Sequence, residues 1–147
     1  LYAQAQELGR LHCELASDLP AIIGDGTQLR QVIHNLVQNA LDAVADRDDG
    51  RVTVRTEVAR TEQGVIRAVR LQVVDNGPGF APKILSRAFE PYVTSKVRGT
   101  GLGLPMVKKI VDEHGGRIDV ANRADGSGAS VSILLLKLAP EANLAEA

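Results

Sequence analysis

The clearest pattern in the sequence is an apolar stripe between residues 29 and 44. Its apolar positions recur in steps of about three and one: Leu29, Val32, Ile33, Leu36, Val37, Ala40, Leu41 and Val44. That period places them on one face of an α-helix. Asp25 and Gln28 have the spacing of a capping box, so the helix is expected to begin there, and Asp48-Asp49-Gly50 is expected to end it.

Five further segments are typical of strands. The first is a short extended run, and the others place apolar residues at every second position, as in strands with one buried face. They cover residues 10–15, 52–58, 69–73, 117–122 and 129–136. Short turns join the second segment to the third and the fourth to the fifth, so two hairpins are predicted.

Residues 75–103, between the two hairpins, have a different composition, rich in glycine and proline. A loop of this length inside a compact domain usually has a functional reason to exist. A short helical turn is expected around residues 83–89. A second helix is expected from Leu104, with Pro105 in its first turn, to His114-Gly115-Gly116.

The predicted order is strand, helix, hairpin, long loop, helix, hairpin. It lacks the regular βαβ alternation of a doubly wound sheet. We therefore predict an α/β (α+β) two-layer sandwich, with about three helices on one face of a mixed, largely antiparallel sheet. The 147 residues suit one domain, which we expect at residues 1–139, followed by a disordered tail at 140–147.

Composition and charge narrow the class of protein. Hydrophobic residues make up 44% of the chain, charged residues 24%, and the net charge is -1, which gives no electrostatic reason to expect nucleic acid or an anionic membrane as a partner. No apolar run approaches the roughly 20 residues of a membrane span. The one cysteine, Cys13, fits a reducing, cytoplasmic compartment. Because the chain begins at Leu1, we expect it to be a fragment of a longer protein.

A polar stripe lies opposite the apolar face of the first predicted helix. It consists of Gln31, Asn35, Asn39 and Asp42, at spacings of four, four and three residues, which stack on one side of a helix. A solvated surface is the simple interpretation. Carboxamides are nevertheless an unusual choice for solubility, because Glu and Lys are better helix formers than Asn. An Asn carbonyl oxygen can hold Mg²⁺ that is already paired with phosphates, so a magnesium–phosphate site is the alternative.

The segment Asp75-Asn-Gly77-Pro-Gly79 carries a second candidate site. Asn-Gly between apolar runs is a common hairpin turn, and that interpretation stays open. Asp75, however, ends a strand whose pattern indicates burial, and the two glycines leave the backbone beyond it without side chains. A flat ring can approach the main chain there, and a carboxylate that accepts from an exocyclic amine would select adenine over guanine.

A third candidate is the run from Gly99 to Leu104, which places glycines at alternate positions directly before the second predicted helix. The amides of such a run, with the positive end of the helix dipole, can bind phosphate oxygens. Lys96 and Arg98 add positive charge nearby. A flexible linker with a helix cap is the other interpretation. The run is neither a P-loop, because no Gly-Lys-Ser/Thr follows, nor a dinucleotide-binding fingerprint, because no strand precedes it.

In this order, these segments resemble the GHKL superfamily of gyrase, heat-shock chaperone, histidine kinase and MutL ATPases, and within it the catalytic domain of bacterial histidine kinases. The resemblance covers about residues 20–137. It rests on an N box (31–43), a G1 box (75–79), an F box (89–92, with Tyr92 where Phe is common), a G2 box (99–104) and a last glycine motif (126–130). Residues 27–31 and 107–116 are also similar to nitrogen-regulation sensors of the NtrY and NtrB type.

The resemblance implies a Bergerat fold that binds ATP and Mg²⁺ between the first helix and a lid at about residues 77–101. It implies that Asn39 holds the magnesium ion and Asp75 binds the adenine amine. Asn35, Asn39 and Lys96 are expected to act in catalysis. The expected ATP-binding residues are Asn35, Asn39, Asp42, Ala43, Asp75, Gly77, Gly79, Phe80, Lys96, Thr100, Gly101, Leu102, Gly103, Leu104 and Ser130. The expected partners are the protein's own dimerisation and histidine-phosphotransfer domain and a response regulator.

Asn35 distinguishes a kinase from a hydrolase. In the hydrolysing members of the superfamily and in anti-sigma serine kinases, a Glu at this helix position acts as general base, whereas an amide cannot accept a proton at neutral pH. A neutral histidine already carries a lone pair, so transfer to it requires mainly alignment and charge neutralisation. The sequence therefore favours transfer of the ATP γ-phosphate to a histidine. An ATP-sensing interaction module without transfer and an anti-sigma-type serine kinase are the alternatives.

The phosphoacceptor is expected outside this chain. His12 lies in a predicted strand and lacks a His-Glu helix context with a following Asn-Pro. His34, on the first helix, is expected to be an ordinary packed histidine. His114 lies at a helix end, where a positive charge would complement the helix dipole.

Overall fold

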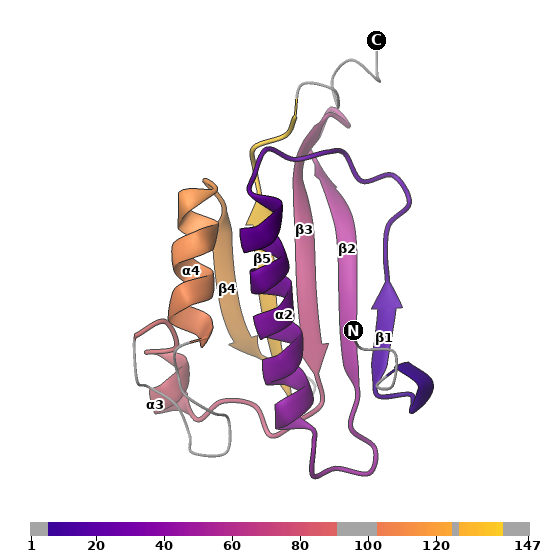
Figure 1. The fold of residues 1–147 in the computed structure, drawn as a ribbon, viewed down its shortest axis with the longest axis vertical. Coiled ribbons are helices and arrows are strands. Elements are labelled where there is room, and N and C mark those ends of the chain that lie inside the picture. Colours follow the sequence, from indigo (N-terminus) through magenta and orange to yellow (C-terminus); the bar gives the residue numbers. More distant parts are fainter. Residues whose placement is uncertain (1–5, 91–102, 125–126, 140–147) are drawn as a thin grey trace.

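A five-stranded mixed sheet forms one layer of the protein, in a computed structural model that describes residues 6–90, 103–124 and 127–139. The strand order is β1-β2-β3-β5-β4, with β1 parallel to β2 and all other neighbours antiparallel (Figure 1). The strands are β1 (Leu11–Glu14), β2 (Val52–Arg60), β3 (Ile66–Asp75), β4 (Arg117–Asn122) and β5 (Ala129–Leu135). Both predicted hairpins are confirmed, although β3 begins three residues before its predicted start.

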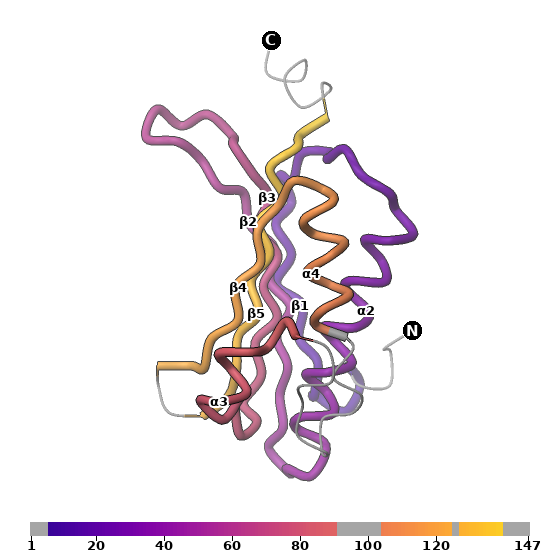
Figure 2. Tube along the Cα trace, turned by 90° about the vertical axis from the view of Figure 1, so that its left-hand side faces the viewer, coloured from indigo at the N-terminus to yellow at the C-terminus, as the bar shows by residue number. Residues whose placement is uncertain are grey.

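Two helices, α2 (Gly26–Ala43) and α4 (Gly103–Glu113), form the second layer. Figure 2 shows both on the same side of the sheet, so the predicted two-layer sandwich is confirmed. The short helix α3 (Pro82–Leu85) begins one residue before the helical turn that the sequence predicts. Pro82 and Pro105 both lie in first turns, where the missing proline N–H costs nothing. The predicted tail at 140–147 lies outside the described residues.

The core lies between the helices and the inner face of the sheet. Residues paired in register share a face, so the inner face carries pairs such as Val54 with Val73 and Leu71 with Ile133. The side chains with almost no exposed surface are Leu36, Ile133, Val32, Val44, Val52, Val107 and Val111. All are aliphatic, as the predicted stripes require.

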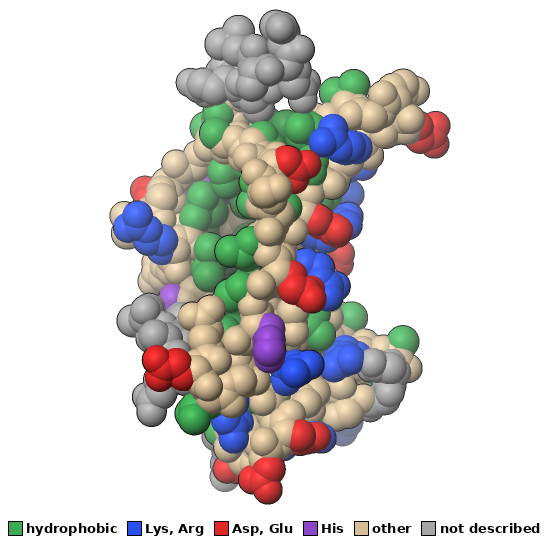
Figure 3. Space-filling model, turned by 90° about the vertical axis from the view of Figure 1, so that its right-hand side faces the viewer, with side chains coloured by type: hydrophobic (Ala, Val, Ile, Leu, Met, Phe, Trp, Pro, Cys, Tyr) green, Lys and Arg blue, Asp and Glu red, His purple; other side chains and the backbone are tan. Residues whose placement is uncertain are grey.

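The outer face of the sheet is polar. Cross-strand ion pairs lie on it at 2.7 Å, from Arg55 to Glu14 and from Arg70 to Glu57, and Figure 3 shows acidic and basic side chains side by side along one edge of the molecule. Exposed pairs of this kind contribute little to stability. Because these side chains are charged, the outer face of the sheet can stay in contact with water. It needs no second covering layer, in agreement with a two-layer fold.

His114 connects the start of α2 to the end of α4. The Asp25 side chain caps α2 as predicted, accepting from the Thr27 and Gln28 N–H groups. The Asp25 N–H, however, donates to His114 Nε2 at 3.0 Å rather than to the Gln28 side chain. A nitrogen that accepts this bond carries no proton, while Nδ1 bonds to the Ile110 carbonyl at 2.8 Å. The prediction that His114 complements the dipole as a cation is therefore wrong.

Replacing His114 with alanine is expected to lower the free energy of unfolding by about 1–2 kcal/mol, because two hydrogen bonds are lost and the Asp25 N–H loses its partner. The ring also packs so closely on Gly24 that a Cβ there would lie 2.7 Å from His114 Cδ2. Urea unfolding followed by circular dichroism measures the change. Lys109→Ala, at an exposed position of α4, is the control, and equal stability of the two variants would contradict this role.

Candidate ATP-binding site

Three chain segments meet at one end of the sandwich. The C-terminal end of α2, the C-terminal end of β3 and the N-terminal end of α4 all lie at the lower end in Figure 1. Helix α4 follows residues 91–102, which lie outside the described part. The predicted residues Lys96, Thr100, Gly101 and Leu102 fall in that segment. Apart from Ser130 on β5, the other predicted site residues belong to α2, to the end of β3 and the chain just after it, or to the start of α4.

Asp75 is the most conspicuous of these residues. Its side chain ends β3 on the inner face and the residue is 4% exposed, which makes it the one buried polar or charged residue found in the described ranges. Its Oδ1 accepts hydrogen bonds from the Gly77 N–H at 2.9 Å and the Ala129 N–H at 3.3 Å. Burying a carboxylate is costly, and these bonds offset the cost while fixing the orientation of the carboxylate. The predicted buried strand end is thus confirmed.

Glycines bring the backbone close around this carboxylate. A Cβ on Gly77 would lie 2.8 Å from the Ala43 carbonyl oxygen and 3.1 Å from Asp75 Oδ1, so the end of α2 touches the Asp75 loop. A Cβ on Gly128 would lie 1.9 Å from the Asp75 carbonyl oxygen, and the φ of Gly128 is +112°. No side chain fits at either position without moving the loop.

Phe80 is held by Asn122, a residue that the sequence reasoning missed. The Asn122 side chain accepts from the Phe80 N–H and donates to the Phe80 carbonyl, both at 2.8 Å. Gly79, with φ +78°, makes this approach possible, since a Cβ there would lie 2.9 Å from Asn122 Oδ1. The chain beyond Asp75 is therefore anchored to the end of β4. The sequence did contain a signal for this role. Asn122 continues the alternation of Ile118 and Val120 along β4, so it is a polar residue at an inner-face position.

The polar stripe of α2 is exposed at its two ends, Gln31 and Asp42, and half-buried at Asn35 and Asn39. Gln31 donates to Met106 Sδ of α4 at 3.4 Å. Asn35 Nδ2 is buried and has no hydrogen-bond partner among the described residues. The Asn39 side chain is half-buried and likewise forms no hydrogen bond within the described ranges. Asp42 differs, because it is exposed and its carboxylate accepts from Gln38 at 2.9 Å.

The last predicted residue, Ser130, does not belong to this group. Ser130 lies opposite Val74 in the sheet, so its side chain is on the outer face, where Ser130 Oγ accepts from Gln72 at 3.1 Å. Its neighbour Ala129 occupies the inner position beside Asp75. Because side chains alternate along a strand, the Ser130 hydroxyl lies on the opposite face of the sheet from the Asp75 carboxylate, and its role in ATP binding stays a prediction.

Comparison with known protein families shows to which family the chain belongs. Residues 24–140 match the family described as histidine kinase-, DNA gyrase B-, and HSP90-like ATPases. The chain belongs to this ATPase family. The match spans all three segments that meet here, and membership of the family supports ATP as the ligand of the domain.

Relatives of this ATPase domain include sensor proteins. It is 41% identical over 109 residues to the sensory histidine kinase/phosphatase NtrB of Rhizobium leguminosarum bv. phaseoli, covering 69% of this chain and 28% of that protein. It is 37% identical to the C4-dicarboxylate transport sensor protein DctB of Rhizobium meliloti, covering 88% and 20%. The chain thus spans less than a third of the length of these relatives.

Solved structures support the same placement of the ATPase domain. The nucleotide-free catalytic domain of histidine kinase ThkA has a TM-score of 0.74 and 30% sequence identity, and the match covers 92% of this chain and 85% of that one. Full-length ShkA in complex with AMPPNP has a TM-score of 0.69 and 32% identity, with 93% and 28% covered. The resemblance to histidine kinase catalytic domains, predicted from the sequence motifs, is confirmed at the level of fold and family.

Two further observations on the ATPase domain concern membranes and metal ions. No helix in the described ranges is long and apolar enough to cross a membrane. Within those ranges, no group of three or more His, Cys, Asp and Glu side chains is arranged to hold a metal ion.

Proposed function

We propose that this chain is the catalytic domain of a sensor histidine kinase, which transfers the γ-phosphate of ATP to a histidine on a dimerisation domain elsewhere in the protein. The observation that carries the proposal is the buried Asn35 amide with its unpartnered Nδ2. A buried donor without a partner is costly, so it favours a ligand that supplies an acceptor. A phosphate oxygen is such an acceptor.

In the proposed binding mode, the adenine ring and the phosphates of ATP lie at different ends of the site. Adenine would lie against Gly77 and Gly79, with its exocyclic amine donating to the oriented carboxylate of Asp75. Phe80 and Ala43 would flank it. The phosphates would lie toward the N-terminus of α4, where Gly103 and Leu104 begin an 11-residue helix whose positive dipole end attracts anions. Lys96, Thr100, Gly101 and Leu102 remain expected phosphate contacts outside the described residues.

Mg²⁺ is proposed as the metal that accompanies ATP. The donor set fits, because the Asn39 amide forms no hydrogen bond within the described ranges and its carbonyl oxygen is a hard, neutral ligand. In a metal–ATP complex Mg²⁺ commonly takes its other ligands from phosphate oxygens and water, so a single protein oxygen suffices. Bound there, Mg²⁺ would neutralise charge on the transferring phosphoryl group.

During the transfer, the protein's own residues need only stabilise charge on the phosphate. The acceptor histidine attacks the γ-phosphorus with a nitrogen lone pair, the bond to the bridging oxygen breaks, and ADP leaves. The Asn35 N–H group and the amides at the start of α4 would stabilise charge on the phosphate oxygens. The amide at position 35 cannot take a proton from water, which disfavours hydrolysis. The predicted alternative of a serine kinase is disfavoured for the same reason.

The partners follow from the proposal. A dimerisation and histidine-phosphotransfer domain would supply the acceptor, and a response regulator would receive the phosphate. ThkA has been solved in complex with the response regulator protein TrrA, and that complex supports the second partner by similarity. A cytoplasmic location, where ATP is available, goes with this proposal. An ATP-sensing module without transfer remains the competing function.

Labelled ATP mixed with this chain and the upstream dimerisation helices of its own protein tests the proposal. We expect the helices to acquire phosphate that is labile in acid and stable in base, which is the signature of phosphohistidine. The chain alone is expected to bind ATP and to label itself poorly. Base-labile phosphate on the helices would point to serine, and binding without any transfer would point to the sensing module.

A further inference from the structure

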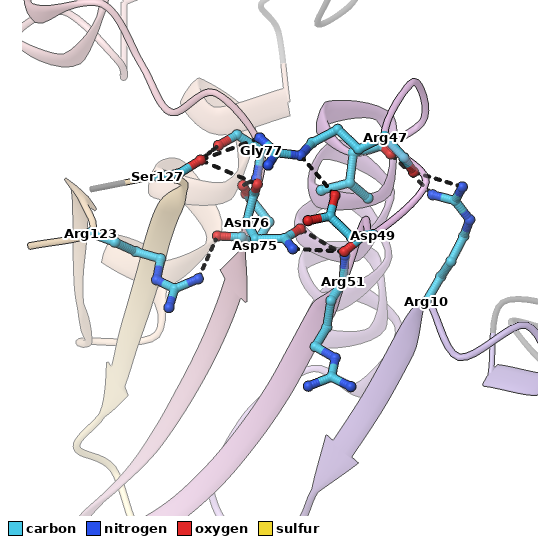
Figure 4. A network of polar contacts seen from close by, with 10 residues as sticks. Arg10, Arg47, Asp49, Arg51, Asp75, Asn76, Gly77, Arg123 and Ser127 are labelled. Carbon is cyan, nitrogen blue, oxygen red and sulfur yellow. Dashed lines mark hydrogen bonds and ion pairs between the residues drawn. The ribbon is translucent and has the colours of Figure 1, made fainter. Parts of the chain in front are cut away.

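The loop that carries Asp75 is held by two side chains from the connection between β4 and β5. Arg123 Nη1 donates to the Asp75 carbonyl at 3.4 Å. Ser127 Oγ lies 2.7 Å from the Gly77 carbonyl and 3.4 Å from the Asn76 carbonyl, and donates to this pair of oxygens. Figure 4 shows these contacts converging on the turn after β3. The carbonyls of three successive residues are thus tied from outside the loop.

Ser127 and Ala129 close a ring around the Asp75 carboxylate. Asp75 Oδ1 accepts from the Gly77 N–H at 2.9 Å and from the Ala129 N–H at 3.3 Å, while Ser127 binds the other side of Gly77. Gly128 lies between them, against the Asp75 carbonyl. The donor that orients the carboxylate is therefore held in place by the Ser127 hydroxyl.

Arg47 extends this ring to the end of α2. Its Nη1 donates to Ser127 Oγ at 3.3 Å and its Nε pairs with Asp49 Oδ1 at 3.3 Å. The Arg47 carbonyl accepts from Arg10 Nη2 at 2.9 Å, so the arginine backbone is itself anchored (Figure 4). A continuous path of hydrogen bonds then runs from the segment after α2, through Ser127, to Gly77 and the Asp75 carboxylate.

We propose that Ser127 and Arg47 are positioning residues that set the selectivity of this site for adenine over guanine. The inference rests on the proposed function, in which Asp75 accepts from the adenine amine. Guanine presents a carbonyl oxygen at the same place, which a fixed carboxylate repels. If Gly77 is released, the carboxylate can turn away, so both the attraction for adenine and the repulsion of guanine weaken.

The test measures dissociation constants for ATP and for GTP on the whole chain, by competition against a fluorescent ATP analogue. We expect Ser127→Ala to lower the ratio of ATP to GTP affinity about 5- to 10-fold, the size of one lost hydrogen bond to a buried loop. Arg47→Gln should lower it about 3-fold, since it acts through Ser127. The double variant should match Ser127→Ala, because the two residues act through one contact. Ser132→Ala, on the outer face of β5, is the matched control and should leave the ratio unchanged.

A purely structural role for Ser127 gives a different result. Partial unfolding lowers the active fraction for every nucleotide equally, so the affinity ratio would stay at the wild-type value, and that outcome overturns the inference. Ser127→Thr, which keeps the hydroxyl, should restore most of the ratio, and failure to do so also counts against it. A wild-type chain that shows no preference for ATP, or an Asp75→Asn variant that keeps it, would instead remove the proposed function on which the inference rests.

Discussion

Asp75→Asn is expected to weaken ATP binding by about 100-fold or more while leaving the fold intact. The asparagine Oδ1 can still accept from the Gly77 and Ala129 N–H groups, so the loop keeps its bonds. Adenine, however, loses a charge-assisted hydrogen bond worth about 1.5–3 kcal/mol, and the new amide N–H group opposes the exocyclic amine donor. Titration calorimetry with ATP measures the loss, and urea unfolding is expected to show a stability change below about 1 kcal/mol.

Asp119→Asn is the matched control for this substitution. Asp119 lies on β4 at an exposed position of the outer face, so the same chemical change is made away from the site. Its affinity for ATP should equal that of the wild type. Unchanged nucleotide affinity in Asp75→Asn would show that Asp75 does not bind adenine, whatever its burial.

Asn39→Ala is expected to abolish the dependence of ATP binding on Mg²⁺. The side chain has no hydrogen bond to lose within the described ranges, so stability should change little. Loss of the metal would remove several kcal/mol of charge stabilisation from phosphoryl transfer, which corresponds to a rate reduction of about 100-fold or more. Binding is measured with and without a chelator, and transfer is measured on the separate dimerisation helices.

Gln38→Ala provides the comparison on the same helix. Gln38 is an exposed amide one position before Asn39 and bonds only to Asp42 among the contacts described. It should keep the wild-type response to Mg²⁺. If Asn39→Ala also kept that response, the metal would have to be held elsewhere, and the assignment of Asn39 would be wrong.

Most of the fold could be predicted because it depends on local periodicity. The α2 stripe, both hairpins and the second helix follow from patterns of burial that each segment carries in its own residues. The failure at the start of α2 has a different cause. The Asp25 N–H is taken by His114, 89 residues away, and a capping box considered alone cannot reveal a competitor from another helix.

Sequence motifs predict the candidate site residues, whereas contacts between residues far apart in the chain could not be predicted. Asp75 and its glycines are in contact with the end of α2, as the proposed pocket requires. Ala129-Ser130-Val131-Ser132 alternates, so both serines lie on the polar outer face of the sheet. Arg47 and Ser127 are 80 residues apart and meet only in the folded chain, so no local pattern links them.

The strand order has a consequence for how the protein folds. The β2–β3 and β4–β5 hairpins are each local in sequence, but they join along β3 and β5, which bring distant residues such as Val74 and Ser130 together. Loop-closure entropy makes such distant pairing late, so we expect the hairpins to form first and to dock afterwards. The turn after β3 and the start of β5, which together enclose the Asp75 carboxylate, then come together only at docking. Nucleotide would bind the docked state alone, and ATP should raise the melting temperature with its concentration by mass action.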